Sequence, residues 1–497
     1  MALAIEEPRG RTIDRVSLVL ATVATVFLGW LVGSGGEIKL AIVFLVGVIG
    51  AAVVFARPLI GAIGLVFITY TNFSDIMITV LGLPSVSKQI APFLMLVLAG
   101  RWFFFYEKPF FHGLATFLLA CFGGLIAFGA VHAAEPDLAI EGFEDFVKNA
   151  VLALVILAFL RERNAFRSIT WALLAAAGFL CTIACYKYAV GAWHMDFGGF
   201  ARTIYEERRL AGPLEDPNFF AAMLVFILPL AADRAMHGVT LAWRMLGAYI
   251  GVVVLIAIVL TTSRGALVAM AAMLVAAGLF YEARVVVRLV VVACIAALCG
   301  AVLLSDELIE RFAVLIEILS PHASAAATDT SVQGRLAEWM VALQLFLDNP
   351  LLGVGIGGYN AHFQDYSLDL GLMARGADRS AHGLYVEILA EMGIVGFILF
   401  AIIVGCAIFA VRRALTMLSE PHQARDRAEV AAFGLAVVGY LAAMTFLHDA
   451  YPRFLWMILV IAIALPQIVE RWRGVSAVPL AHALVLDRNR RRATEYA

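Results

Sequence analysis

Long apolar runs constrain the fold of this chain more than any other sequence feature. Most of the runs are roughly 17 to 25 residues long, which is enough for an α-helix to cross a hydrocarbon core of about 30 Å. We count about fourteen runs, and because two of them are short the predicted number of spans is about 12 to 14. They lie at residues 16–33, 38–56, 58–72, 87–106, 113–131, 146–160, 168–190, 218–236, 243–261, 264–281, 285–304, 383–411, 428–447 and 453–470. The predicted fold is an all-α polytopic membrane protein.

The composition excludes a soluble globular protein. Hydrophobic residues make up 63% of the 497 residues, charged residues only 15%, and the mean hydropathy is +0.92. A soluble protein would carry far more charge on its surface. The six cysteines all lie within apolar stretches, so they indicate neither a disulfide framework nor a zinc site. No metal, cofactor or nucleic-acid partner is expected.

Basic residues predict the orientation in the membrane. Under a fourteen-span count they gather in alternate loops, from Arg9, Arg11 and Arg15 before the first span to the run 488–492 near the end. The positive-inside rule then places both termini in the cytoplasm. The first apolar run is interpreted as an uncleaved span.

The same count places three polar loops on the outer face, at residues 131–145, 190–217 and 305–382. The first is acidic. The third is the longest and ends in Ser380-Ala381-His382. Loops of that length are usually functional or disordered, so we expect the chemistry there.

Two helices are predicted within the long loop. Apolar residues at helical spacing mark them: Leu308, Phe312, Leu315 and Leu319 in the first, and Trp339, Leu343, Phe346 and Leu347 in the second. Pro350 should stop the second helix. The glycines of residues 353–358 should let the backbone pass closely beneath a ligand. Their spacing also fits a dinucleotide-binding pattern, but no strand precedes them, which argues against that function.

Arginines on the predicted outer face break the positive-inside pattern. They are Arg202, Arg208, Arg209, Arg264, Arg335, Arg375 and Arg379. A guanidinium group binds phosphate oxygens through two parallel hydrogen bonds and stays charged at biological pH, so these residues suit an anionic lipid. The alternative is that each arginine pairs with a nearby carboxylate. The roles of Arg202, Arg208, Arg375 and Arg379 are left open.

Three segments carry a resemblance to a known family. They are Arg209-Leu-Ala-Gly212 with Asp216-Pro217-Asn218-Phe219; Thr262-Ser263-Arg264-Gly265-Ala266; and a third that runs from Gly334-Arg335-Leu-Ala-Glu-Trp339 through Asp348-Asn-Pro350-Leu-Leu-Gly353 and Ala381-His382-Gly-Leu-Tyr385 to Glu391-Met-Gly393-Ile-Val-Gly396. Their order and spacing resemble the O-antigen ligase and polymerase superfamily of bacterial surface-glycan assembly over roughly residues 200–400. Gly383 stands where that family often has Asn.

The resemblance implies a fold, a reaction and a set of site residues. The fold would be that of a C-type membrane glycosyltransferase with an external helical loop, in the bacterial inner membrane with its site on the periplasmic face. The reaction would be metal-independent, inverting transfer of a glycan from undecaprenyl pyrophosphate to an acceptor glycan or glycolipid. His382, whose imidazole titrates near neutrality, would be the base, and Arg209, Arg264 and Arg335 would hold the pyrophosphate. Residues that would orient the acceptor or support the site are Asn218, Glu387, Trp339, His448, Asp449 and Arg453.

Other functions are left open at this stage. The acceptor could be a lipid A core sugar, a growing polysaccharide or a protein hydroxyl. A transporter of a lipid-linked sugar or a small anion would also need many spans and a few membrane arginines. It would not need a long loop with a base, and no internal repeat is evident. A purely structural scaffold would leave the outer arginines unexplained.

The sequence thus divides into five predicted regions. They are residues 1–200 (N-terminal spans), 201–304 (spans with the outer-face arginine motifs), 305–382 (periplasmic helical loop), 383–474 (C-terminal spans) and 475–497 (a basic cytoplasmic tail).

Overall fold

The computed structural model describes residues 47–48, 50–74, 86–133, 135–160, 163–192, 200–202, 208–281, 284, 287, 330–372, 379–447 and 453–472. The chain forms two compact units. Unit 1 consists of residues 1–111 and 155–172, and unit 2 of residues 112–154 and 173–497.

The described residues contain seven helices that are long and apolar enough to cross a membrane. These are Gly113–Val131, Asn164–Ala189, Pro217–His237, Leu241–Thr261, Leu384–Met417, Pro421–Phe446 and Arg453–Trp472. Shorter apolar helices lie at Pro58–Thr71, Ile90–Phe105 and Arg264–Ala276. The prediction of a helical, multi-pass membrane protein is therefore confirmed. The count of fourteen stays a prediction, because the expected span at 16–33 and nearly all of that at 285–304 lie outside the described residues.

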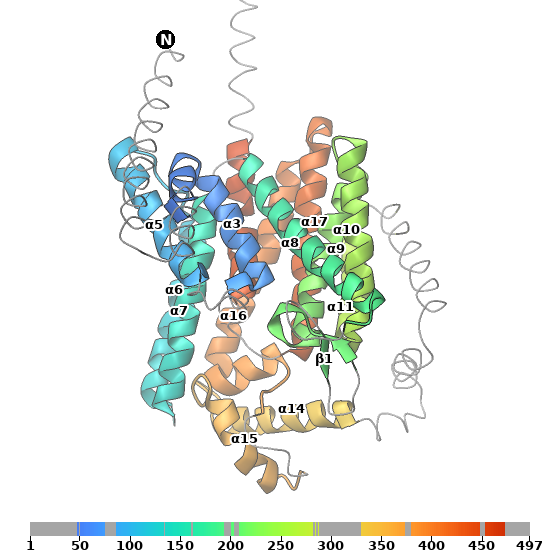
Figure 1. Ribbon diagram of the computed structural model, residues 1–497. Helices are drawn as coiled ribbons and strands as arrows, with labels where there is room; N and C mark the ends of the chain where they lie inside the picture. The colour runs from blue at the N-terminus through green and yellow to red at the C-terminus, as the bar shows by residue number, and fades with distance from the viewer. Residues whose placement is uncertain are drawn as a thin grey trace, which may run out of the picture. The chain divides into compact units, whose positions relative to one another are not determined.

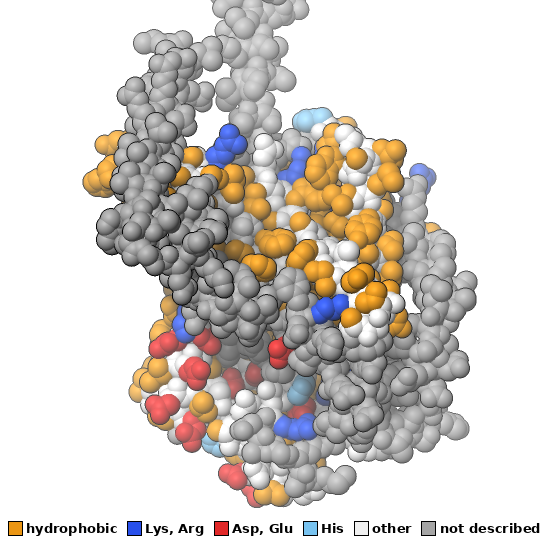
Figure 2. Space-filling model, in the orientation of Figure 1, with side chains coloured by type: hydrophobic (Ala, Val, Ile, Leu, Met, Phe, Trp, Pro, Cys, Tyr) orange, Lys and Arg blue, Asp and Glu red, His pale blue; other side chains and the backbone are white. Residues whose placement is uncertain are grey.

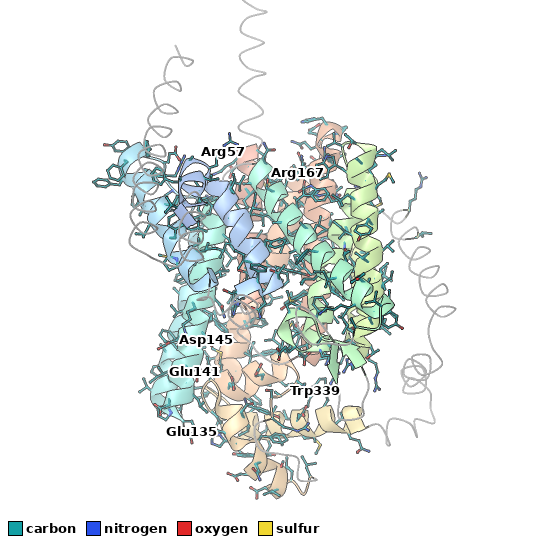
Figure 3. All side chains as sticks on the ribbon, viewed as in Figure 1. Arg57, Glu135, Glu141, Asp145, Arg167 and Trp339 are labelled. Atoms are coloured by element: carbon teal, nitrogen blue, oxygen red, sulfur yellow. The ribbon has the colours of Figure 1, made fainter. Side chains whose placement is uncertain are left out.

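Unit 1 contains α3 (Pro58–Thr71), α5 (Val86–Phe105) and the start of α8 (Arg163–Ala189). Pro58 opens α3 at a position where its missing N–H costs nothing. At Gly61 α3 comes so close to α5 that an added Cβ would lie 2.5 Å from the Leu94 side chain. Arg57 and Arg167, both in this unit, are marked in Figure 3.

Unit 2 contains most of the described elements (Figure 1). In chain order these are α6 (Gly113–His132), α7 (Pro136–Ala158), β1 (Phe200–Arg202), β2 (Arg208–Leu210), η1 (Gly212–Leu214), α9 (Pro217–His237), α10 (Leu241–Thr261), α11 (Arg264–Ala276), η2 (Ala277–Leu279), α14 (Thr330–Asp348), α15 (Gly358–Asp369), α16 (Leu384–Met417), η3 (Pro421–Gln423), α17 (Ala424–Ala443) and η4 (Met444–Phe446). The helix Arg453–Trp472 follows. α9 packs against both α10 and α17, while α14 lies crosswise to them at one end (Figure 1).

Aromatic side chains fill the interior of the helix bundle in unit 2. Phe226 of α9 makes edge-to-face contacts with Phe433 of α17 and Phe454 of the last helix. Trp456, which is completely buried, contacts the rings of Phe122 and Phe146. Such ring pairs add about 0.5–1.5 kcal/mol each beyond their buried area, so they fix the packing of these helices.

The acidic segment at 131–145 is not the connecting loop that the sequence predicted. α7 begins at Pro136, so most of this segment forms the first half of a helix. Its carboxylates are exposed, and Lys148 lies 3.4 Å from Glu144 and 3.0 Å from Asp145, at the i,i+4 and i,i+3 spacings that stabilise a helix. Red side chains gather over this part of the molecule in Figure 2, and Figure 3 marks Glu141 and Asp145 along α7.

The glycine-rich segment at 353–358 packs against α16 at a break in that helix. α16 is broken at Gly393, where φ is 61°. Residues 350–355 fill the break by backbone hydrogen bonds, among them Val354 N to Ala390 O (3.0 Å) and Ile394 N to Pro350 O (2.9 Å). A Cβ on Gly353 would lie 2.3 Å from the backbone of Glu391, so only glycine fits. Gly353 packs backbone against backbone, and the hydrogen bonds of this segment satisfy polar groups that the broken helix exposes.

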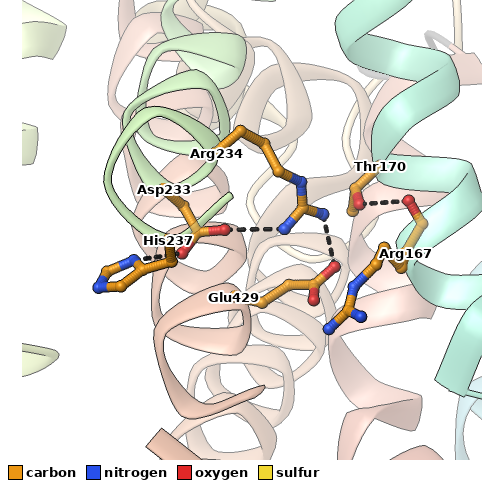
Figure 4. A network of polar contacts seen from close by, with 6 residues as sticks. All are labelled: Arg167, Thr170, Asp233, Arg234, His237 and Glu429. Carbon is orange, nitrogen blue, oxygen red and sulfur yellow. Dashed lines mark hydrogen bonds and ion pairs between the residues drawn. The ribbon is translucent and has the colours of Figure 1, made fainter. Parts of the chain in front are cut away.

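A buried ionic cluster near the C-terminus of α9 ties this helix to α17 (Figure 4). Arg234 lies 2.8 Å from Asp233 and 2.5 Å from Glu429, and all three side chains are about 95% buried or more. His237 approaches the other oxygen of Asp233 at 3.1 Å. Buried charges are tolerated when they are paired in this way, and breaking such a group costs about 3–5 kcal/mol.

Candidate active site

Arg209 is held at the end of a two-stranded hairpin. β1 and β2 pair antiparallel, with Ala201 opposite Arg209. The Nε of Arg209 donates to the backbone oxygen of Thr261 (2.9 Å), and Nη2 donates to Oδ1 of Asn218 (3.2 Å). The side chain therefore caps the C-terminus of α10, where a cation is favoured. Nη1 makes no hydrogen bond within the part of the chain that the structure describes.

The starts of α9 and α11 are joined by short polar contacts. Asp216 caps α9, because its Oδ1 accepts from the backbone N–H groups of Asn218 (2.7 Å) and Phe219 (2.9 Å). Ser263 caps α11 and donates its hydroxyl hydrogen to Oδ1 of Asn218 (2.9 Å). Asn218 thus links the side chain of Arg209 to that of Ser263.

Three of the predicted arginines act on one another electrostatically. Burial lowers the pKa of Arg209 to about 10; the Asp216 carboxylate opposes this shift, while the charges of Arg335 and Arg264 add to it. Arg264 is also the first residue of α11, a helix end that already carries partial positive charge. Like charges gathered in this way, at the N-terminus of a helix, form a strong site for a multivalent anion.

The ring of Phe446 packs against two residues of α14, Arg335 and Trp339. The guanidinium carbon of Arg335 lies 5.8 Å from the centre of the Phe446 ring, in a cation–π arrangement. Trp339, one turn further along α14, stacks on the same ring with a centroid distance of 6.5 Å and an interplanar angle of 18°. Gly265 leaves the room for this ring, since a Cβ there would lie 3.3 Å from Phe446.

His382 is held by α14 on the other side of Trp339. The indole Nε1 of Trp339 donates to the backbone oxygen of His382 (3.4 Å). His382 has a φ of 40°, in a region that residues other than glycine seldom occupy. Strained backbone of this kind is concentrated at functional sites, where the surrounding contacts must hold it.

The contacts of His382 indicate which tautomer its neutral ring adopts. Nδ1 lies 3.0 Å from Oε2 of Glu338 and 3.0 Å from the backbone oxygen of Ser380. Both neighbours only accept hydrogen bonds, so we assign the hydrogen of the neutral ring to Nδ1. Nε2 then carries the lone pair that can take up a proton.

Glu338 is the charged neighbour of His382. Its side chain is only 2% exposed; its Oε2 makes an ion-pair contact with Nδ1, while the hydrogen bond of Nδ1 goes to the backbone oxygen of Ser380, and Oε1 accepts from Arg379 (2.9 Å). Burial acts to raise the pKa of this carboxyl, but the close contacts and charges of His382 and Arg379 outweigh it and hold the pKa below its usual value. The group is therefore a carboxylate at neutral pH.

Tyr359 of α15 completes this support. Its hydroxyl donates to the backbone oxygen of Glu338 (2.9 Å). Burial, together with the nearby carboxylates of Glu338 and Glu387, raises the pKa of Tyr359 far above its usual value, so it remains a phenol. Tyr359 also belongs to a small apolar core, with Val341, Leu345 and Phe363 among its members, that joins α14 and α15 to the start of α16.

The structure thus brings together Arg209, Asn218, Arg264, Arg335, Trp339 and His382 through the contacts above. Glu387 is buried in the first turn of α16, and its carboxylate helps to raise the pKa of Tyr359. Arg453 is exposed at the start of the last helix. His448, Asp449 and Arg375 lie outside the described residues, as do the side chains of Arg202 and Arg208.

Sequence reasoning missed four residues of this site: Ser263, Glu338, Arg379 as the partner of Glu338, and Phe446. Glu338 offered a signal, because it lies three residues after Arg335 in the same motif and hence on a neighbouring face of one helix. Phe446 offered none, since it is an apolar residue in an apolar run far along the chain.

These features define a class: a multi-pass membrane protein with several arginines near a histidine that lies against a buried carboxylate. Residues 249–401 match the family model described as O-antigen ligase. The match confirms the resemblance to the O-antigen ligase and polymerase superfamily over a segment that contains Arg264, Arg335 and His382, while Arg209 and Asn218 precede it. The search of curated proteins found no match.

Proposed function

We propose that this protein is a glycosyltransferase that moves a glycan from undecaprenyl pyrophosphate to an acceptor hydroxyl, with its site on the periplasmic face of the inner membrane. The observation that carries the proposal is the convergence of three arginines beside a histidine whose Nδ1 is held by a buried carboxylate. The O-antigen ligase match supports the choice of a lipid-linked glycan as donor and a polysaccharide or glycolipid as acceptor.

The arginine cluster would bind the pyrophosphate of the donor. Arg209, Arg264 and Arg335 supply donor groups from β2, α11 and α14, and their mutual repulsion is relieved when a multivalent anion binds. The same groups would stabilise the negative charge that grows on the leaving oxygen as the glycosidic bond breaks. The diphosphate would be neutralised by arginine, so we expect turnover without a divalent cation.

His382 would act as the general base. Nε2 takes the proton from the acceptor hydroxyl while its oxygen attacks the anomeric carbon, the bond from that carbon to the phosphate oxygen breaks, and undecaprenyl pyrophosphate leaves. Attack from the face opposite to the leaving group inverts the anomeric configuration. Glu338 keeps the hydrogen on Nδ1 and stabilises the imidazolium as it forms, as an orienting carboxylate does in other histidine-based sites.

The test is glycan transfer in proteoliposomes from a synthetic undecaprenyl-pyrophosphate oligosaccharide, with lipid A core or no added acceptor in parallel. His382→Gln should lower turnover about 10²–10⁴-fold, and Arg335→Gln about 10²–10³-fold. His362→Gln is the matched control, because His362 lies on α15 and its ring contacts the Gly358 backbone oxygen at 2.7 Å. EDTA should leave turnover unchanged.

Two results would overturn the proposal. Wild-type protein that makes no product but moves the donor across the bilayer would be a transporter. Turnover that EDTA abolishes and a divalent cation restores would show that arginines alone do not neutralise the diphosphate. Transfer that requires lipid A core would identify a ligase, and transfer with donor alone a polymerase.

A further inference from the structure

A cavity of about 420 Å³ lies in unit 2 at the far end of α16 from His382. It is formed by the start of α6, the last turns of α16 and the last turns of Arg453–Trp472. Its volume falls in the range of about 300–1,000 Å³ that is usual for small-ligand sites. Leu114, Phe409 and Ile463 supply apolar wall, and Phe409 is 69% exposed. An exposed aromatic wall on a membrane helix suits an acyl chain.

The polar groups of the cavity fall into donors and acceptors. Arg413 is exposed, and its guanidinium makes no hydrogen bond or ion pair with the described residues. His112 caps α6 by accepting from Ala115 N through Nδ1 (3.2 Å), so its Nε2 carries the hydrogen of the neutral ring. These two donors match a phosphate.

The acceptors come from the last helix. Glu470 is an exposed carboxylate at the cavity. Oε1 of Gln467 is shielded from solvent and accepts no hydrogen bond within the part of the chain that the structure describes. A buried amide oxygen without a donor costs about 1–3 kcal/mol, so the site favours a ligand that brings an N–H group.

We propose that this cavity binds a phospholipid with a primary ammonium headgroup, the phosphate on Arg413 and His112 and the ammonium on Gln467 and Glu470. One cation and one carboxylate at the same cavity complement a zwitterion better than an anionic lipid. A choline headgroup carries the same charges but has no N–H to give to Gln467. The cavity is at the opposite end of the bundle from the arginine site, so it serves a lipid that is not the glycan donor.

The test compares phosphatidylethanolamine, phosphatidylcholine and phosphatidylglycerol with identical acyl chains, titrated into the full-length protein in detergent. Lipid retained on the protein is measured by native mass spectrometry, and the thermal midpoint is followed in parallel. Phosphatidylethanolamine should bind about tenfold more tightly than either of the others, the difference expected from one charge-assisted hydrogen bond. Arg413→Gln should lower its affinity about tenfold.

Gln467→Met separates ligand binding from folding. The variant removes the shielded oxygen, so the lipid-free protein should be as stable as wild type or more so, while its preference for phosphatidylethanolamine is lost. Arg412→Gln is the matched control, because Arg412 is the exposed neighbour outside the cavity lining and should keep the preference. Equal affinity for ethanolamine and choline lipids, tighter binding of the glycerol lipid, or an unchanged preference in Gln467→Met would each overturn the proposal.

Discussion

At the scale of single residues, the account depends on the contact between Glu338 and His382. Glu338→Gln keeps the size of the side chain but removes the charge that orients Nδ1 and stabilises the imidazolium. We expect kcat to fall about 10²–10⁴-fold, since a base held in the wrong tautomer loses most of its effect. KM for the donor should stay within about twofold, because the arginines that bind it are unchanged.

Glu141→Gln is the control for this variant, since Glu141 is an exposed carboxylate on α7. Steady-state kinetics on both variants makes the comparison. A Glu338→Gln protein with wild-type kcat would show that the carboxylate has only a structural role.

The pKa of Glu338 predicts how stability depends on pH. The folded value lies below the usual one, so the contacts with His382 and Arg379 stabilise the fold at pH values above the unfolded pKa of about 4.3, and this stabilisation is lost as the pH falls through the folded pKa. It amounts to about 1 kcal/mol, because Arg379 is 39% and His382 31% exposed. The difference in Tm between wild type and Glu338→Gln should therefore narrow between about pH 5 and pH 3. A difference that stays constant over that range would contradict the assignment.

Residue chemistry in the site was partly predictable from the sequence. His382, Arg264 and Arg335 stand in polar motifs at predicted membrane boundaries, where charges are costly and are kept for a reason. The sequence left open whether Asn218 orients the acceptor or supports the site, because it could not show that the side-chain oxygen of Asn218 accepts from Arg209 and Ser263.

At the scale of elements, the broken helix α16 is the feature most sensitive to substitution. Gly393→Ala or Gly353→Ala would force a Cβ to within about 2.4 Å of backbone atoms at positive φ. We expect each to destabilise the protein by about 2–4 kcal/mol. Gly405→Ala is the control on the same helix, since a Cβ there meets nothing within 4 Å, and it should leave Tm unchanged or slightly higher. Equal effects of Gly405→Ala and Gly393→Ala on Tm would show that the break does not matter.

Elements with a strong local pattern were predictable, and elements made by distant contacts were not. α14 followed from apolar residues at helical spacing and ends at Asp348, just before Pro350. The break in α16 did not, because it depends on hydrogen bonds between residues about 40 positions apart along the chain. The first half of α7 was predicted to be a loop, because its carboxylates were interpreted as part of a solvent-exposed connecting segment. They in fact form the exposed face of a helix.

At the scale of the whole molecule, the predicted topology can be tested with single cysteines. In a cysteine-free background, Glu141→Cys on α7 should react with a membrane-impermeant maleimide added outside intact spheroplasts. Glu420→Cys, exposed between α16 and α17, should react only after the membrane is opened. The opposite pattern would place the arginine site on the cytoplasmic side and would contradict the positive-inside assignment.

Hydropathy alone predicted the class of molecule, because the length of an apolar run is a local property of the sequence. The meeting of β2, α11 and α14 at one site was not visible in hydropathy, since Arg209, Arg264 and Arg335 are separated by whole helices. The resemblance to the family motifs indicated that these three arginines belong to one site. The contacts through Asn218 and Phe446 explain how the arginines meet.

The most direct test of the central claim is the affinity of purified protein for an undecaprenyl-pyrophosphate glycan, measured for wild type, Arg335→Gln and His382→Gln. In the proposed mechanism the arginines bind the diphosphate and the histidine acts only in the chemical step. Arg335→Gln should therefore raise Kd about tenfold or more, while His382→Gln should keep Kd within about twofold of wild type. Wild-type affinity in Arg335→Gln, or an equal loss of affinity in both variants, would contradict this division of roles.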